Sequence, residues 1–138
     1  MAVAGGTIRR VALGLLCAVV AIPAVALAAN PRKGARYTGK TKPILGSKGH
    51  RVSIRISSDG TRGTIRYCGD RRRKAMSARF RVRNGRFTAK KRERRRGARV
   101  VTFQATGRFS SATRVSGDIV VVFKCDHIPG SYTARLRR

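Results

Sequence analysis

Apolar and polar residues alternate along several short stretches of the chain. Residues 52–57, 101–109 and 119–125 each place an apolar or small side chain at every second position. A period of two puts those side chains on one face of a β-strand, whereas a helix repeats about every 3.6 residues. These stretches therefore predict strands with one buried face. In residues 119–125, Val120 and Val122 make the second face apolar as well, which predicts a central strand.

A turn signal between two further stretches predicts a tight hairpin. Asn84-Gly85 separates residues 76–83 from residues 86–90, and this dipeptide accepts the two positive φ values of a type I′ turn. In the register that this turn sets, the expected cross-strand pairs are Val82 with Phe87 and Phe80 with Ala89 on the buried face, and Arg83 with Arg86 and Arg79 with Lys90 on the other.

The pattern as a whole predicts an all-β fold. Shorter strands are expected around residues 37–41, 64–68 and 132–136, and no segment of about ten residues beyond residue 28 shows a helical period. About seven short strands separated by Gly, Asn, Asp and Ser turns are typical of an antiparallel β-sandwich. A small antiparallel β-barrel is the alternative, because periodicity alone does not separate the two.

The N-terminal segment has the order of a signal peptide. Arg9 and Arg10 precede an apolar stretch over residues 11–27, and small residues end it at Ala28. This order matches the basic, apolar and cleavage regions of an exported chain, with cleavage after Ala28. We therefore expect residues 1–28 to be a signal-peptide helix that is removed, and the protein to be secreted or held in the cell envelope. A retained membrane anchor is the alternative, since a span needs about 20 apolar residues.

The length and charge of the part that follows the leader indicate one small, strongly basic domain. Removal of 28 of the 138 residues leaves 110, enough for one domain with a modest core. We expect residues 29–49 to form a flexible basic arm with a possible short first strand, and residues 50–138 to form the single β domain. The whole chain has a formal net charge of +28, which loss of Arg9 and Arg10 lowers by two, to +26. Charge of this size favours association with polyanions.

Two cysteines remain after removal of the leader and predict one disulfide. Cys17 lies in the leader, which leaves Cys68 and Cys125 to pair in an oxidising compartment. The closed loop would contribute about 4 kcal/mol by restricting the unfolded chain. A metal site is the weaker interpretation, because Cys125 and His127 lack a second closely spaced pair of ligands.

The densest positive charge falls on the predicted hairpin. Directly opposed like charges destabilise a sheet, so an anionic ligand would relieve the strain of this face. We therefore predict a polyanion-binding strip, extended by a neighbouring basic loop; a solvated face neutralised by counterions is the alternative. The predicted strip consists of Arg79, Arg81, Arg83, Arg86 and Lys90, with Arg71, Arg72 and Arg73 in the loop.

Catalytic groups are few. The chain has two His and five carboxylates, and it contains no nucleophile motif of the G-x-S-x-G type. Asp126-His127 is the one adjacent acid and histidine, and neighbours in a strand point to opposite faces. We expect no catalytic residue, no metal and no cofactor.

Several short motifs together resemble a family of small secreted β-rich domains found in high-GC bacteria. Its relatives consist of a signal peptide and one such domain, and they have no assigned activity. Many of them have Trp where this chain has Tyr132, and the arginine runs are denser here. The resemblance implies export and an all-β fold and supplies no catalytic residue. The motifs are Tyr37-Thr38-Gly39-Lys40-Thr41, Asn84-Gly85-Arg86-Phe87, Gly107-Arg108-Phe109, residues 112–119 with Gly117, Cys125, and Ser131-Tyr132-Thr133-Ala134-Arg135.

The sequence thus predicts a secreted, non-catalytic basic β domain that associates with anionic cell-envelope polymers, lipid headgroups or other polyanions. Nucleic acid is expected as an adventitious ligand, because the aromatic residues are assigned to the core rather than to base stacking. No protein partner is identifiable. The alternatives are a small-molecule carrier or inhibitor on a closed β-barrel and, third, a hydrolytic enzyme.

Overall fold

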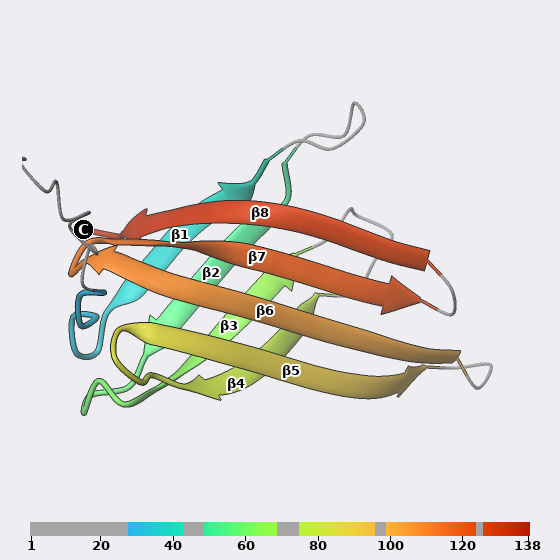
Figure 1. Ribbon diagram of the computed structural model, residues 1–138, viewed down its shortest axis with the longest axis horizontal. Helices are drawn as coiled ribbons and strands as arrows, with labels where there is room; N and C mark the ends of the chain where they lie inside the picture. The colour runs from blue at the N-terminus through green and yellow to red at the C-terminus, as the bar shows by residue number, and fades with distance from the viewer. Residues whose placement is uncertain (1–27, 43–48, 69–74, 96–98, 124–125) are drawn as a thin grey trace, which may run out of the picture.

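The computed structural model describes residues 28–42, 49–68, 75–95, 99–123 and 126–138. These residues form eight antiparallel strands in one sheet of order β4-β3-β2-β1-β8-β7-β6-β5 (Figure 1). The described part contains no helix, which confirms the all-β prediction. The strands are β1 (Arg36–Thr41), β2 (Arg51–Ile56), β3 (Arg62–Cys68), β4 (Met76–Arg81), β5 (Arg86–Arg95), β6 (Arg99–Ser111), β7 (Arg114–Phe123) and β8 (Asp126–Leu136).

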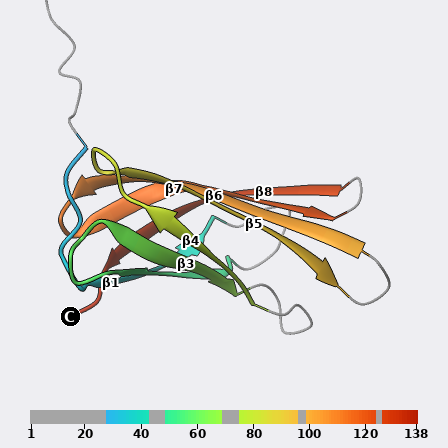
Figure 2. The same ribbon diagram turned by 90° about the horizontal axis from the view of Figure 1, so that it is seen from below.

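The sheet is nearly closed into a barrel. The first and last strands pair with each other, from Tyr37 opposite Leu136 to Thr41 opposite Tyr132. The strands at the two ends of the sheet order are β4 and β5, which are neighbours in sequence and contact each other (Figure 2). Of the two expected architectures the barrel is therefore the observed one, with eight strands in place of about seven. We call the boundary between β4 and β5 the seam.

The Asn84-Gly85 turn is confirmed, but the hairpin that it was expected to start is not. Asn84 and Gly85 have φ values of 51° and 67°, and Arg83 pairs with Arg86 as an isolated bridge. Beyond this bridge β4 pairs with β3, and β5 pairs with β6. The expected pairs of Val82 with Phe87, Phe80 with Ala89 and Arg79 with Lys90 are therefore wrong; the observed partners are Gly63 for Phe80, Thr64 for Arg79, Gly107 for Phe87, Ala105 for Ala89 and Gln104 for Lys90.

Much of the segment expected to be a flexible arm is part of the sheet. The short first strand is present as β1, which lies between β2 and β8. Its Tyr37 side chain is fully buried, and the hydroxyl donates to the carbonyl of Ala112 at 2.7 Å. Before it, the N–H of Ala29 donates to the carbonyl of Phe109 at 2.8 Å. The boundary expected near residue 50 therefore falls inside the barrel.

The barrel interior holds the hydrophobic core. Alternate residues of each strand point inward and pack together as the period of two predicts. Burial of this face supplies the main driving force for folding. The largest fully buried side chains are Tyr37, Tyr132, Phe103, Phe109, Ile54, Ile56, Ile65, Ile119, Val52, Val101 and Val115.

Several predictions concern residues that the structure does not describe. Residues 1–27 of the expected leader, Arg71, Arg72, Arg73 and Cys125 lie outside the described ranges. Within those ranges no helix is long and apolar enough to cross a membrane. Cys68, the one cysteine among the described residues, is half-buried at the end of β3. The disulfide therefore stays a prediction.

Candidate polyanion-binding site

Two aromatic rings close the seam where backbone pairing stops. Phe80 of β4 and Phe87 of β5 stack with ring centroids 3.9 Å apart and an interplanar angle of 15°. Both side chains are buried, at 5% and 4% exposure. Stacked aromatic pairs add about 0.5–1.5 kcal/mol beyond the burial of their area. Side-chain packing thus joins the two edge strands beyond the Arg83–Arg86 bridge.

Each of these rings lies over a glycine of the neighbouring strand. Phe80 is in register with Gly63, where a Cβ atom would lie 2.4 Å from the ring. Phe87 is in register with Gly107, where a Cβ atom would lie 2.2 Å from the ring. An aromatic ring packed across strands on a glycine compensates for the missing side chain. The two glycines therefore make the room that the stacked pair needs.

A buried tyrosine makes a hydrogen bond to β6 next to the glycine on which Phe87 packs. The Tyr132 hydroxyl donates to the carbonyl of Thr106 at 2.9 Å. Burial raises the pKa of Tyr132, and the nearby Asp118 carboxylate raises it further. The phenol therefore stays protonated and acts as a fixed hydrogen-bond donor beneath β6.

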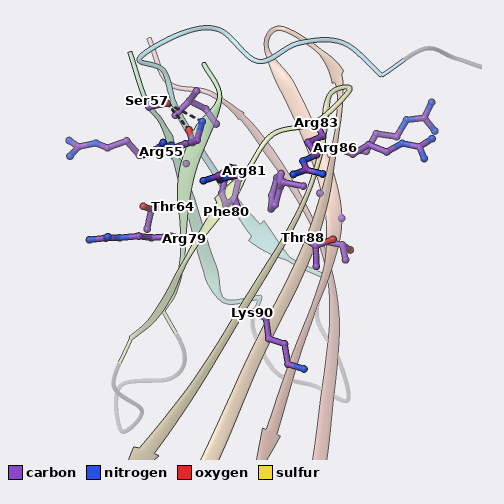
Figure 3. A pocket seen from close by; sticks show the side chains of 18 of the residues that line it. Arg55, Ser57, Thr64, Arg79, Phe80, Arg81, Arg83, Arg86, Thr88 and Lys90 are labelled. Carbon is purple, nitrogen blue, oxygen red and sulfur yellow. Dashed lines mark hydrogen bonds between the residues drawn. The ribbon is translucent and has the colours of Figure 1, made fainter. Parts of the chain in front are cut away.

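An open hollow of about 1310 Å³ is centred on the seam (Figure 3). Strands β2 to β7 or their adjoining turns contribute to it, with Phe80 and Phe87 among the lining residues. Its charge is strongly positive, because the lining includes eight basic side chains and Asp118 as the one acidic side chain. The basic residues are Arg55, Arg62, Arg79, Arg81, Arg83, Arg86, Lys90 and Arg108.

Five of these arginines form a row that crosses the strands. Three pairs stand directly opposite each other: Arg62 with Arg81, Arg83 with Arg86, and Arg86 with Arg108. Arg81 and Arg83 link the pairs, two positions apart on one segment. We call Arg62, Arg81, Arg83, Arg86 and Arg108 the arginine row. The first four are exposed and Arg108 is half-buried.

The cations spread over a curved surface rather than converge on one point. In Figure 3, Arg81 lies beside Phe80 near the centre of the view, and Arg86 lies to their right. Arg55 and Arg79 extend away from them to the opposite side of β3. A single small anion would contact few of these groups, whereas an extended ligand could contact several.

The structure brings all five residues of the predicted hairpin strip to this hollow, although in a different register. Arg79, Arg81, Arg83, Arg86 and Lys90 all line it. Sequence reasoning missed three further members, namely Arg55, Arg62 and Arg108. Arg55 and Arg108 do alternate with apolar residues in their own strands, so the pattern indicates that they face outward. The pattern does not give the order of the strands in the sheet, and only that order shows that Arg55 and Arg108 lie near the predicted hairpin strip.

Two titratable side chains outside the hollow, those of His50 and Asp59, make contacts that stabilise the fold. The ring of His50 contacts Tyr67 edge to face, with centroids 5.5 Å apart. The Ser57 hydroxyl and the N–H and hydroxyl of Thr61 donate to the Asp59 carboxylate and lower its pKa to about 2. Asp59 thereby fixes the turn between β2 and β3. His127 is paired with Val122 in β8, and its side chain is not described.

No group of three potential metal ligands occurs among the described residues. Comparison of the chain with family models, curated proteins and solved structures finds no match. The likeness to small secreted β-rich domains therefore stays an expectation from the sequence.

Proposed function

We propose that this protein is a secreted, non-catalytic domain that associates with extracellular polyanions through the arginine row. The supporting observation is the cross-strand register of that row. Like charges directly opposite each other on a sheet destabilise it, and here Arg86 has an arginine on both sides. A bound polyanion would convert this repulsion into charge-assisted hydrogen bonds, which are stronger than neutral ones.

The side chains suit such a ligand. Arg offers a planar fork of five donors that matches phosphate and carboxylate oxygens, and it stays charged at any physiological pH. Seven of the eight cations that line the hollow are arginines. Asp118 at its margin lies opposite Ser131 and offsets a small part of the charge. The four exposed members of the row, Arg62, Arg81, Arg83 and Arg86, can reach an incoming anion.

Export and a disulfide belong to the same proposal. The expected leader would direct the domain out of the cytoplasm, where cell-envelope polymers, lipid headgroups and released nucleic acids would supply the anions. Cys68 at the end of β3 would be joined to Cys125, which lies in the sequence between β7 and β8. The bridge would restrain a domain whose charge opposes compaction.

The carrier alternative receives less support. A carrier on a small barrel needs an interior with room for one ligand, and the described interior is filled by large side chains. Phe103 and Phe109 are fully buried there, together with Tyr37 and Tyr132 at 2% exposure or less. The hydrolase alternative depends on Asp126 and His127, whose side chains are not described.

The test is retention of the exported protein on a heparin or phosphate resin. The variant pair Arg62→Gln/Arg81→Gln removes two facing members of the row. Arg114→Gln/Arg135→Gln is the matched control, because these two exposed arginines also face each other but do not line the hollow. We expect the first pair to lower the eluting salt concentration clearly more than the second. Equal shifts would show that net charge alone acts, and the proposed site would be abandoned.

A further inference from the structure

We infer that the arginine row takes a flexible single-chain phosphate polymer, wound across the strands, in preference to a flat anionic surface or a rigid duplex. This inference rests on the proposed function and names the class of polyanion. It follows from the curvature of the barrel, the spacing of the row and the burial of the nearby aromatic residues.

Curvature argues against a flat ligand. The row runs from β3 through β4 and β5 to β6, four adjacent strands of the eight when the seam is crossed. It therefore spans three of the eight steps between neighbouring strands, and its members line the open hollow at the seam. A plane of lipid headgroups can touch only the rim of a hollow and so reaches few of these arginines at once. A stiff duplex has a persistence length of about 150 base pairs and cannot bend round a domain of this size. A flexible chain can reach all five arginines.

The spacing of the row matches a chain of closely spaced anionic groups, each within reach of one or two arginines. Adjacent strands lie about 4.8 Å apart, and two positions along a strand span about 6.7 Å. The steps between Arg62 and Arg81, Arg81 and Arg83, and Arg86 and Arg108 therefore fall between these values at the backbone. A phosphate chain with one charge per short repeat can place successive charges at such intervals without stretching.

The opposed pairs favour phosphate over carboxylate. Facing arginines on different strands can approach a shared anionic group from different directions. Each internal phosphate of a chain has two non-bridging oxygens on a tetrahedral phosphorus, and these accept hydrogen bonds over a wider range of directions than the oxygens of a planar carboxylate, which prefer donors near their own plane. Arg83 and Arg86 on the two sides of the turn, and Arg86 and Arg108 on β5 and β6, form two such shared sites.

The ligand's bases or other substituents are not expected to be recognised. Stacking on exposed aromatic side chains is the usual way to hold the bases of a single strand. Phe80 and Phe87 lie in the hollow's lining, but they are 5% and 4% exposed and stack on each other. The contact would therefore be with the backbone of the polymer and independent of its sequence.

The experiment measures dissociation constants of the exported protein at several salt concentrations. The probes are linear polyphosphate, a single-stranded oligothymidylate, a DNA duplex of the same length, polyglutamate and vesicles of anionic phospholipid. We expect polyphosphate and oligothymidylate to bind with similar affinity and at least tenfold more tightly than the other three. For a single-stranded ligand the slope of log K against log salt should fall by about 0.7 for each row arginine changed to Gln. Arg114→Gln should leave that slope unchanged.

The outcomes separate this inference from the proposed function. If polyglutamate or vesicles bind as tightly as polyphosphate, and Arg62→Gln/Arg81→Gln weakens both, the row binds polyanions but the inference of a phosphate chain is overturned. Tighter binding of the duplex overturns the argument from curvature. If no probe discriminates the row variants from Arg114→Gln/Arg135→Gln, both proposals fail. Arg86→Lys keeps the charge and removes the fork of the arginine common to both shared sites; equal affinity of this variant for polyphosphate would contradict the role assigned to shared phosphates.

Discussion

Phe80 and Phe87 face each other across the seam with ring centroids 3.9 Å apart, and each lies over a glycine of the next strand. The stacked pair thus holds β4 and β5 together beyond the point where backbone hydrogen bonds between them end. Most barrels of this kind close by strand pairing all the way round. Here closure depends on two side chains, so changes to them should affect the fold more than other core substitutions of equal size.

The first prediction concerns the coupling of the two rings. Phe80→Ala and Phe87→Ala should each destabilise the protein by about 3–5 kcal/mol, through lost burial and the cavity left behind. The double variant should cost less than the sum by about 1 kcal/mol, because the stacking contact is lost only once. Urea unfolding of the four proteins measures this coupling. Strict additivity would mean that the stack does not hold the seam; Phe80→Leu provides a milder variant if the alanine changes prevent folding.

The second prediction concerns the glycines under the rings. Gly63→Ala places a methyl group 2.4 Å from the Phe80 ring and should displace it, at a cost of about 1–3 kcal/mol. The cost should shrink in the Phe80→Ala background, where the ring is absent, and persist in the Phe87→Ala background. Thermal unfolding of the single and double variants compares the two. A similar cost in both backgrounds would assign the strain to the backbone carbonyl of Arg55, the other close neighbour.

The third prediction concerns the turn that carries the middle of the arginine row. Asn84 has a φ of 51°, a left-handed conformation that Asn and Gly tolerate better than other residues. Asn84→Ala should destabilise the protein by about 1 kcal/mol, whereas Asn84→Gly should be close to neutral. Denaturant midpoints report both. Equal effects of the two changes would show that the Asn side chain, rather than its backbone conformation, stabilises the turn.

The fourth prediction concerns acid. The pKa of Asp59 is lowered to about 2 by hydrogen bonds from Ser57 and Thr61, against about 3.9 in an unfolded chain. The native state therefore binds this proton less readily than the unfolded state. The stabilising effect is fully present above about pH 4 and is lost as the pH falls through 2. Unfolding between pH 5 and 1.5 should show a smaller decline for Asp59→Asn than for the unchanged protein, and parallel curves would contradict the assignment.

The fifth prediction concerns the cysteines. If Cys68 and Cys125 are joined, the exported protein should lack the mass of two hydrogens and should take up no alkylating reagent until it is reduced. Its mass should also correspond to a chain that begins at Ala29. Reduction should destabilise the domain by about 4 kcal/mol. Two thiols that react without reductant would refute the bridge and weaken the evidence for an oxidising compartment.

The sequence predicts the strands well because their pattern is local. The period of two in residues 52–57 and 101–109 and the Asn84-Gly85 turn each depend on a few adjacent residues, and each appears in the structure. The seam could not be predicted in this way. The turn alone favours pairing of Phe80 with Ala89, but Phe80 and Phe87 pack on Gly63 and Gly107 instead. Those glycines lie on β3 and β6, outside the segment whose pattern predicts the hairpin.

The candidate site, too, could be predicted only in the part that depends on residues close together in the sequence. The hairpin arginines are close in sequence, and their gathering could be predicted. Arg62 and Arg108 join the row through the pairing of β3 with β4 and of β5 with β6. No property of their own neighbours indicates this, because an outward arginine in an amphipathic strand has the same pattern wherever the strand lies in the sheet.

The pairing of the first strand with the last determines when the molecule can fold. Tyr37 and Leu136 are partners although 99 positions apart, so the barrel cannot close until nearly the whole chain is available. Contacts of such long sequence separation make folding slow. A partly synthesised chain can pair its consecutive strands, but β1 keeps an unpaired edge until β8 is available. Closure of the barrel is therefore the step of folding that waits for the end of the chain.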